Sequence, residues 1–180
     1  MKDVSTLRLA LLGLIAREPC SAYDVRKVFE ATPMGHFSAS PGAIYPALKR
    51  LEDNGWISGR AAKAKTLRPK RVYRLTTKGR QALTKRLSQE ITHDDVTRNL
   101  DDVILRFAFM DKLLDREQIA DLLNQLRSEM ESCLSSLQEL LESIRNELSF
   151  CDELSMKHGI AKARMNIAWA KRAIEMLQND

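Results

Sequence analysis

The residues best suited to bind a ligand are basic side chains gathered between positions 60 and 71. No Asp or Glu lies in this stretch, whose six cations are Arg60, Lys63, Lys65, Arg68, Lys70 and Arg71. A dense run of Lys and Arg attracts the phosphates of a polyanion, whereas the plainer alternative is a solvated basic loop. The charge of the rest of the chain helps to decide between the two.

The 180-residue chain divides into a basic half and an acidic half. Residues 1–90 carry 18 Lys and Arg against 7 Asp and Glu, a net charge of +11, whereas residues 91–180 carry a net charge of −6. This asymmetry favours a first half that meets a polyanion and a second half that does not. With 6% aromatic residues and only seven glycines, the composition favours helices over a β-sandwich.

Enzyme chemistry finds little support in the sequence. The three histidines lie far apart and outside metal-ligand spacings, and no glycine-rich phosphate loop is present. We therefore expect no catalytic site, no cofactor and no metal. Cys20, Cys133 and Cys151 are an odd number at wide spacing, which disfavours a disulfide framework and leaves a redox role open. Without a long apolar run or signal-peptide features at the start, we expect a cytosolic protein with no membrane contact.

The apolar spacing predicts two helices in the first 31 residues. Residues 6–16 are nearly all apolar, as in a helix buried on most sides, with Ser5 or Thr6 as its cap. Ser21 and Asp24 have the spacing of a capping box and begin the second helix.

A third helix is predicted between Ser40, its cap, and Gly55, its C-terminal stop. Pro46 lacks an N–H and clashes with the preceding turn, so we expect the regular helix to begin later than Pro41. The apolar residues of this stretch recur every three to four positions, which indicates one buried face.

Two short β patterns at residues 56–58 and 72–75 predict a hairpin, and Thr76 caps a fourth helix that runs towards Ile91. This order of elements is that of a winged helix-turn-helix. We therefore expect a mainly α protein with a DNA-binding domain over residues 1–92, in which the recognition helix and the hairpin meet the nucleic acid.

The second half predicts a long-helix dimerisation domain over residues 93–180. Apolar residues alternate in steps of three and four along a heptad seam, which needs a partner helix. The expected dimer contacts are Leu123, Leu126, Met130, Leu137, Leu140, Ile144 and Leu148. Gly159 is expected to break this pattern before a last amphipathic helix, which carries Trp169 and could fold back onto the seam.

Residues 40–57 (SPGAIYPALKRLEDNGWI) and 68–79 (RPKRVYRLTTKG) resemble the PadR family of bacterial transcriptional regulators. Residues 9–15 and 21–24 match the same family, so the resemblance covers residues 7–79, apart from the hairpin tip at 61–67. The acidic second half is similar, more loosely, to the longer C-terminal domain of the virulence-activator-like subgroup.

The resemblance implies that the start of the third helix faces the major groove and that the hairpin contacts phosphate. The DNA-binding residues expected on this basis and on their chemistry are Tyr23, Ser40, Gly42, Ala43, Tyr45, Lys49, Lys63, Lys65, Arg68, Lys70 and Arg71. For Tyr45 the alternative is a half-buried core aromatic.

The leading hypothesis is a homodimeric repressor that binds a pseudo-palindromic operator in double-stranded DNA. The alternatives are a transcriptional activator or a protein-interaction adaptor that uses the long helical arm. The family also includes regulators that small phenolic or aromatic effectors release from DNA. Phe107 and Trp169 are the candidate pocket residues for such an effector, although plain helix packing explains them as well.

Overall fold

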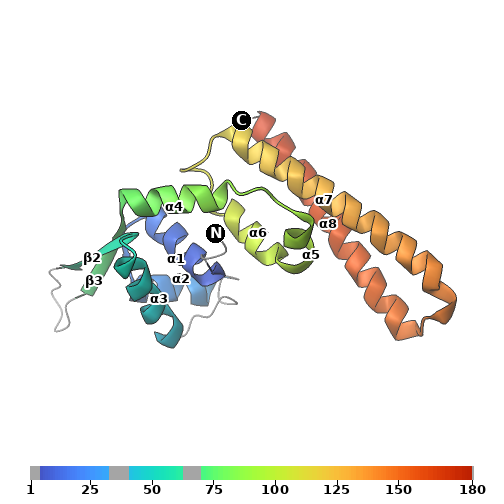
Figure 1. Ribbon diagram of the computed structural model, residues 1–180, viewed down its shortest axis with the longest axis horizontal. Coiled ribbons are helices and arrows are strands. Elements are labelled where there is room, and N and C mark those ends of the chain that lie inside the picture. Colours follow the sequence, from blue (N-terminus) through green and yellow to red (C-terminus); the bar gives the residue numbers. More distant parts are fainter. Residues whose placement is uncertain (1–4, 33–40, 63–69, 180) are drawn as a thin grey trace. The chain divides into compact units, whose positions relative to one another are not determined.

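The computed structural model describes residues 5–32, 41–62 and 70–179 of the chain (Figure 1). It divides into two compact units. The first comprises Met1–Leu87 and Leu105–Leu113, and the second comprises Ser88–Ile104 and Leu114–Asp180. The expected functions of the two domains, DNA binding by residues 1–92 and dimerisation by residues 93–180, stay predictions.

The described residues of the first unit form four helices and a small antiparallel sheet with strand order β1-β3-β2. The helices are α1 (Thr6–Arg17), α2 (Ala22–Ala31), α3 (Pro41–Asp53) and α4 (Thr77–Leu87). The strands are β1 (Cys20–Ser21), β2 (Ile57–Ala62) and β3 (Lys70–Leu75). This is the predicted winged helix-turn-helix order, with β2 and β3 forming the hairpin.

The two N-terminal helices form for the reasons that the sequence indicates. Helix α1 is buried on nearly every side from Leu9 to Ile15, although Ser5 at its start makes no side-chain capping bond. At α2 the predicted capping box is confirmed: the Ser21 hydroxyl accepts from the Asp24 N–H, and the Asp24 carboxylate accepts from the Ser21 N–H at 2.9 Å.

Helix α3 corrects one prediction and confirms another. It begins at Pro41 and continues through Pro46, so the expected later start is wrong. Pro46 lies on the exposed side near the helix start, where it removes only the one backbone bond to Gly42. The predicted stop is confirmed: Gly55 has φ +69°, its N–H donates to Glu52 O, and the next N–H donates to Leu51 O.

The hairpin is longer than the β patterns at residues 56–58 and 72–75 predict. Its register pairs Gly59 with Tyr73 and Arg60 with Val72, so consecutive residues alternate between the two faces of the sheet. Strand β1 was not predicted, because two residues are too few to produce a period. It pairs with the other edge of β3, Cys20 opposite Tyr73, and so joins the start of α2 to the hairpin.

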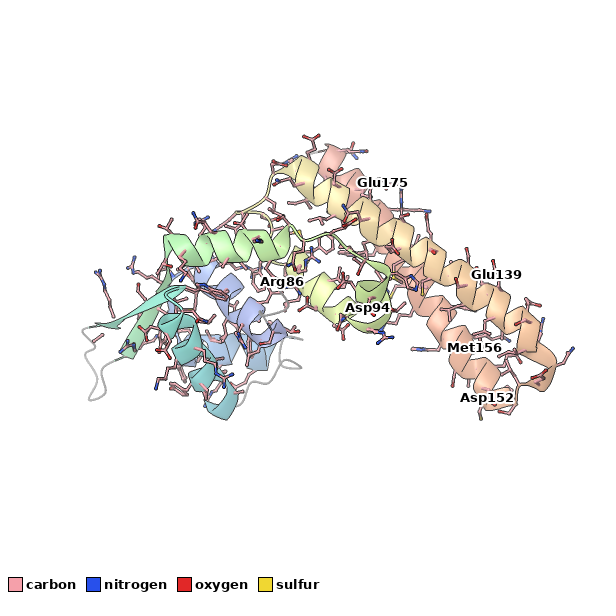
Figure 2. All side chains as sticks on the ribbon, viewed as in Figure 1. Arg86, Asp94, Glu139, Asp152, Met156 and Glu175 are labelled. Atoms are coloured by element: carbon pink, nitrogen blue, oxygen red, sulfur yellow. The ribbon has the colours of Figure 1, made fainter. Side chains whose placement is uncertain are left out.

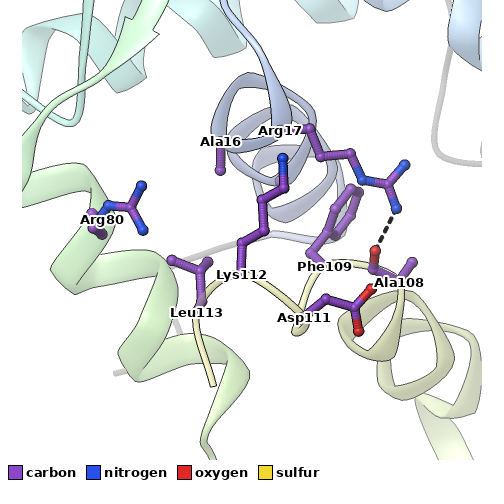
Figure 3. A pocket seen from close by; sticks show the side chains of 9 residues that line it. Ala16, Arg17, Arg80, Ala108, Phe109, Asp111, Lys112 and Leu113 are labelled. Carbon is purple, nitrogen blue, oxygen red and sulfur yellow. Dashed lines mark hydrogen bonds between the residues drawn. The ribbon is translucent and has the colours of Figure 1, made fainter. Parts of the chain in front are cut away.

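The segment 105–113 completes the core of the first unit (Figure 3). Phe109 packs against Gly13 of α1, where a Cβ would overlap the aromatic ring. The Arg17 side chain donates to the Ala108 carbonyl, and its guanidinium lies 5.0 Å from the centre of the Phe109 ring. Helix α1 therefore needs a glycine at position 13 to accept this segment.

A buried arginine ends α4, which stops at Leu87 rather than near Ile91. Arg106 is 1% exposed, and its guanidinium donates to the Leu87 carbonyl oxygen at 2.9 Å. A cation at a helix C-terminus binds carbonyl groups that have no partner within the helix. This role was not predicted, because Arg106 is distant from Leu87 in the sequence.

The second unit is built around two long antiparallel helices, α7 (Arg116–Ile144) and α8 (Phe150–Asn179). The short helices α5 (His93–Arg98) and α6 (Leu100–Phe107), of which α6 crosses the division between the units, precede them, and a 3-10 turn, η2 (Arg145–Glu147), joins α7 to α8. Glu139 of α7 and Asp152 and Met156 of α8 lie near that turn (Figure 2). No described helix is both long enough and apolar enough to cross a bilayer.

The break between the long helices corrects the sequence prediction. The heptad seam from Leu123 to Leu148 suggested one continuous helix with a break at Gly159, but the chain turns at residues 145–149 and α8 passes through Gly159. Ser149 and Asp152 form a capping-box exchange of hydrogen bonds at the start of α8. The Ser-x-x-Asp spacing of a capping box was present in the sequence and could have predicted where the turn lies.

Two glycine substitutions test how closely α4 packs against the residue before β2. We expect Gly79→Ala to destabilise the protein by about 1–3 kcal/mol, because the new methyl group would overlap the rigid Trp56 carbonyl oxygen. Gly159→Ala is the matched control: its Cβ meets nothing nearer than Leu137 Cδ1 at 4.0 Å, so alanine should stabilise α8 by about 0.5–1 kcal/mol. Thermal unfolding measures both. A stable Gly79→Ala variant would contradict the packing at α4.

Candidate nucleic-acid interface

Helix α3 separates a buried face from an exposed one. Ile44, Leu48 and Leu51 are at most 1% exposed and pack into the core, as the spacing predicts. On the opposite face Tyr45 is 59% exposed and Lys49 is exposed. The alternative interpretation of Tyr45 as a core residue is therefore wrong.

The start of α3 leaves room for close approach by a ligand. Gly42 is exposed and lies about one turn before Tyr45 on the same side of α3, and the neighbouring Ala43 is half-buried. Small residues at the start of a recognition helix allow its backbone to approach a groove closely. The predicted contacts Ser40, Lys63, Lys65 and Arg68 lie outside the described residues.

Helix α2 adds a second exposed phenol. Tyr23 is 51% exposed, and the cations of Arg26 and Lys27 lie 5.6 and 4.8 Å from the centre of its ring. Ala22, Tyr23 and Arg26 of α2 line one hollow together with Ile44 and Tyr45 of α3. The two helices thus present two hydroxyl groups beside positive charge, a combination that suits phosphate oxygens.

Two of the predicted phosphate-binding cations are engaged within the chain. Lys70 Nζ lies 2.8 Å from Asp24 Oδ2, and Arg71 Nη2 donates to Glu52 Oε1 at 2.7 Å. These pairs connect β3 to α2 and to α3 respectively. Lys70 and Arg71 are therefore not free cations in this structure.

The ion pairs shift the pKa of both carboxyl groups downward. The hydrogen bond from Arg71 holds the pKa of Glu52 below its usual value, and the bond from the Gly59 N–H adds to this effect. Burial disfavours the charged form of Asp24, but hydrogen bonds from Lys70 and Ser21 outweigh it and lower the pKa. Both carboxylates are thus charged at neutral pH, as the pairs require.

Among its described residues the hairpin carries two further cations, Arg60 and Arg74, on one face of its strands. We define its outer face as Ser58, Arg60, Val72 and Arg74, because residues opposite each other in antiparallel strands share a face. Arg60 and Arg74 are exposed, line a shallow hollow, and form no ion pair with a described residue. Arg74 was missed from the sequence, although its alternation with Tyr73 on β3 could have identified it.

The predicted dimer residues differ in burial. Leu123, Leu126 and Met130 are buried, Leu137, Ile144 and Leu148 are half-buried, and Leu140 is 48% exposed. Helix α8 of the same chain supplies the partner of α7, with Ile160, Ala163, Ile167, Ala170 and Ile174 buried on one face.

A second apolar face of α8 remains exposed, and sequence reasoning did not assign it to a dimer. Its large members are Leu154, Met165, Trp169 and Met176. Met165 is 62% exposed and Met176 is 63% exposed. Because Met165 follows Ala163 by two residues, or about 200° of helix rotation, this face points away from α7.

Phe107 and Trp169 are the candidate effector residues. Phe107 is half-buried at the end of α6, and an effector role for it or for Trp169 stays a prediction.

Burial raises the pKa of the Cys20 thiol to about 11, which disfavours a reactive thiolate. Cys133 is half-buried, Cys151 is exposed, and all three thiols are free. No group of His, Cys, Asp and Glu among the described residues is arranged to hold a metal.

Comparison with known proteins identifies the family. A Bacillus subtilis protein described as negative transcriptional regulator PadR is 28% identical to this chain. The alignment covers 97% of this chain and 98% of that protein. Its crystal structures in complex with operator DNA and with p-coumaric acid are each 26% identical. The first covers 96% of this chain and 99% of that one with TM-score 0.46, and the second covers 97% and 99% with TM-score 0.44.

Two family models together account for most of the chain. Residues 11–85 match the model described as transcriptional regulator PadR-like family, and residues 101–178 match the virulence activator alpha C-term model. The first match contains α2, α3 and the hairpin, and the second contains α7 and nearly all of α8. The family comprises transcriptional regulators rather than enzymes. Residues 11–85 of this chain therefore form a domain of the PadR-like family of transcriptional regulators.

Proposed function

We propose that the protein is a homodimeric repressor whose helix α3 enters the major groove while the outer face of the hairpin lies along phosphates. The observation that carries this proposal is the exposed face of α3, where Tyr45 and Lys49 project from a helix whose other side is buried. An α-helix fits the major groove, and base edges there specify sequence.

Phosphate contacts would fix the register of α3 in the groove. Tyr23 and Tyr45 offer hydroxyl donors, and Arg60 and Arg74 supply charge from a neighbouring element. Such contacts are independent of sequence and set the protein's orientation, whereas Gly42, Ala43 and Lys49 would approach the bases. Lys63, Lys65 and Arg68 remain proposed contacts from the hairpin tip.

Repression is supported by the name of the Bacillus subtilis relative, a negative regulator, and by the simplicity of the mechanism. A bound dimer that covers a promoter blocks polymerase without any further contact surface. Helix-turn-helix dimers read half-sites about one DNA turn apart, which predicts a pseudo-palindromic operator.

We place the dimer contact on the exposed apolar face of α8 rather than along the whole α7 seam. The seam residues Leu123, Leu126 and Met130 are already covered within one chain. A face with exposed Met165, Trp169 and Met176 gains from being covered by the same face of a second copy, because apolar area leaves water.

The first prediction concerns the outer face of the hairpin. Arg60→Gln with Arg74→Gln should weaken binding to specific and random duplexes alike. The slope of log affinity against log salt should fall by up to ~0.9 for each phosphate that a subunit no longer neutralises. Lys162→Gln with Arg164→Gln, which removes two exposed charges from α8, should leave the slope unchanged. Equal slopes for all three proteins would show that this face does not meet phosphate.

The second prediction concerns Tyr45. Tyr45→Phe should lose about 1 kcal/mol of binding free energy per half-site, the usual net value of one hydrogen bond. Because the ring is exposed, the melting temperature should hardly change. Fluorescence titration with a selected operator and a thermal melt measure the two quantities. Unchanged affinity would exclude a hydrogen bond from the phenol to DNA.

The third prediction concerns assembly. Met165→Asp with Met176→Asp should dissociate the dimer, because buried unpaired carboxylates are costly, while the monomer stays folded. Leu140→Asp is the matched control: it places a charge on an exposed seam position of α7 and should leave the dimer intact. Sedimentation measures both. Dissociation by Leu140→Asp alone would assign the interface to the seam instead.

A further inference from the structure

The cations of the hairpin fall into two groups that the sequence does not distinguish. Arg60 and Arg74 project from the outer face without an ion pair to a described residue. Lys70 and Arg71, at the start of β3, instead reach carboxylates on two different helices. Since consecutive residues of a strand project to opposite sides, these two can tie one strand to two neighbours.

Glu52 receives hydrogen bonds from both strands of the hairpin. Its Oε1 accepts from Arg71 Nη2 of β3 at 2.7 Å and from the backbone N–H of Gly59 in β2 at 2.8 Å. Glu52 itself stands in the last turn of α3, one residue before the helix ends. A single carboxylate therefore fixes the hairpin to the helix that is proposed to read DNA.

Gly59 permits this arrangement because it has no side chain. A Cβ at position 59 would overlap the Arg71 guanidinium and would lie only 3.0 Å from Glu52 Oε1 and from the Tyr73 ring. Any larger residue must therefore displace the Arg71 guanidinium that pairs with Glu52. Position 59 thus gives a way to disturb the ion pair without changing a charge.

Asp24 holds the other side of β3. It accepts from Lys70 while it also closes the capping box of α2 through Ser21. The start of α2 and the start of β3 are therefore joined by the same carboxylate. The Lys70 and Glu52 bonds together leave β3 attached to both helices of the helix-turn-helix.

We propose that Arg71 and Lys70 are positioning residues that set the angle of the hairpin against α2 and α3, and that they do not themselves bind phosphate. This inference rests on the proposed function. The phosphates of a duplex are regularly spaced, so Arg60 and Arg74 can meet them only if the hairpin keeps a fixed angle to α3. A phosphate that recruited Arg71 would instead have to displace Glu52 and leave that carboxylate close to the DNA.

The two roles predict effects of opposite sign for Glu52→Gln. If Arg71 binds phosphate, removal of a competing carboxylate strengthens DNA binding. If Arg71 positions the hairpin through Glu52, the same substitution weakens binding, although the protein becomes more positive. We expect the dissociation constant for a random-sequence 30-base-pair duplex to rise about three- to tenfold, with a reduced salt slope because the hairpin neutralises fewer phosphates.

Asp53→Asn is the matched control. Asp53 is the next residue of α3, is exposed, and forms no ion pair with a described residue, so its substitution reports the general effect of removing one negative charge. We expect it to leave binding unchanged or slightly tighter. The double variant Glu52→Gln with Arg71→Gln should bind no more weakly than Arg71→Gln alone, because both changes break the same ion pair.

Gly59→Ala provides a second perturbation that keeps every charge. Displacement of Arg71 should reproduce the weaker binding of Glu52→Gln, measured well below the melting temperature so that only folded protein is compared. Tighter or unchanged binding by Glu52→Gln relative to Asp53→Asn, or unchanged binding by Gly59→Ala, would overturn the positioning role and leave the proposed function intact. Absence of duplex binding by the unmodified protein would overturn the proposed function, and this inference with it.

Discussion

The bond network at Glu52 is the constraint on which the interface depends. One carboxylate at the end of α3 accepts from Arg71 of β3 and from the backbone of Gly59 in β2. A two-stranded hairpin has little stability of its own in water, so its direction is set by what it packs against. In this protein an exposed recognition helix and an exposed cationic face are held as parts of one surface.

Local signals in the sequence predicted most of the first unit because the structures there are local. The capping box at Ser21 and the glycine stop at Gly55 each involve residues within a few positions of one another. The burial of Leu48 follows from the helical period, whereas the sequence left Tyr45 open between a DNA contact and a half-buried core aromatic. Strand β1 and the Arg106 contact with Leu87 depend on partners distant in sequence, and no local pattern carries that information.

The sequence predicted most of the cations that belong to the candidate site, but not which carboxylates they pair with. The sequence identified Lys70 and Arg71 as cations, but it could not show that Asp24 and Glu52 lie within 3 Å of them. Arg74 was also not predicted as a DNA contact, because its availability to DNA depends on which face of β3 remains exposed. In the second unit the sequence indicated that the last helix could fold back onto α7, but it predicted neither the turn at residues 145–149 nor the second apolar face that α8 exposes.

Backbone amide chemical shifts of the full chain, recorded with and without a DNA duplex, test the central claim most directly. We predict that the largest changes fall in α3, at Gly42 and Ala43 near its start and at Tyr45 on its exposed face, and on the outer face of the hairpin at Arg60 and Arg74. The amides of α7 and α8 should change little. Changes confined to α7 and α8, or no changes on α3, would contradict the account.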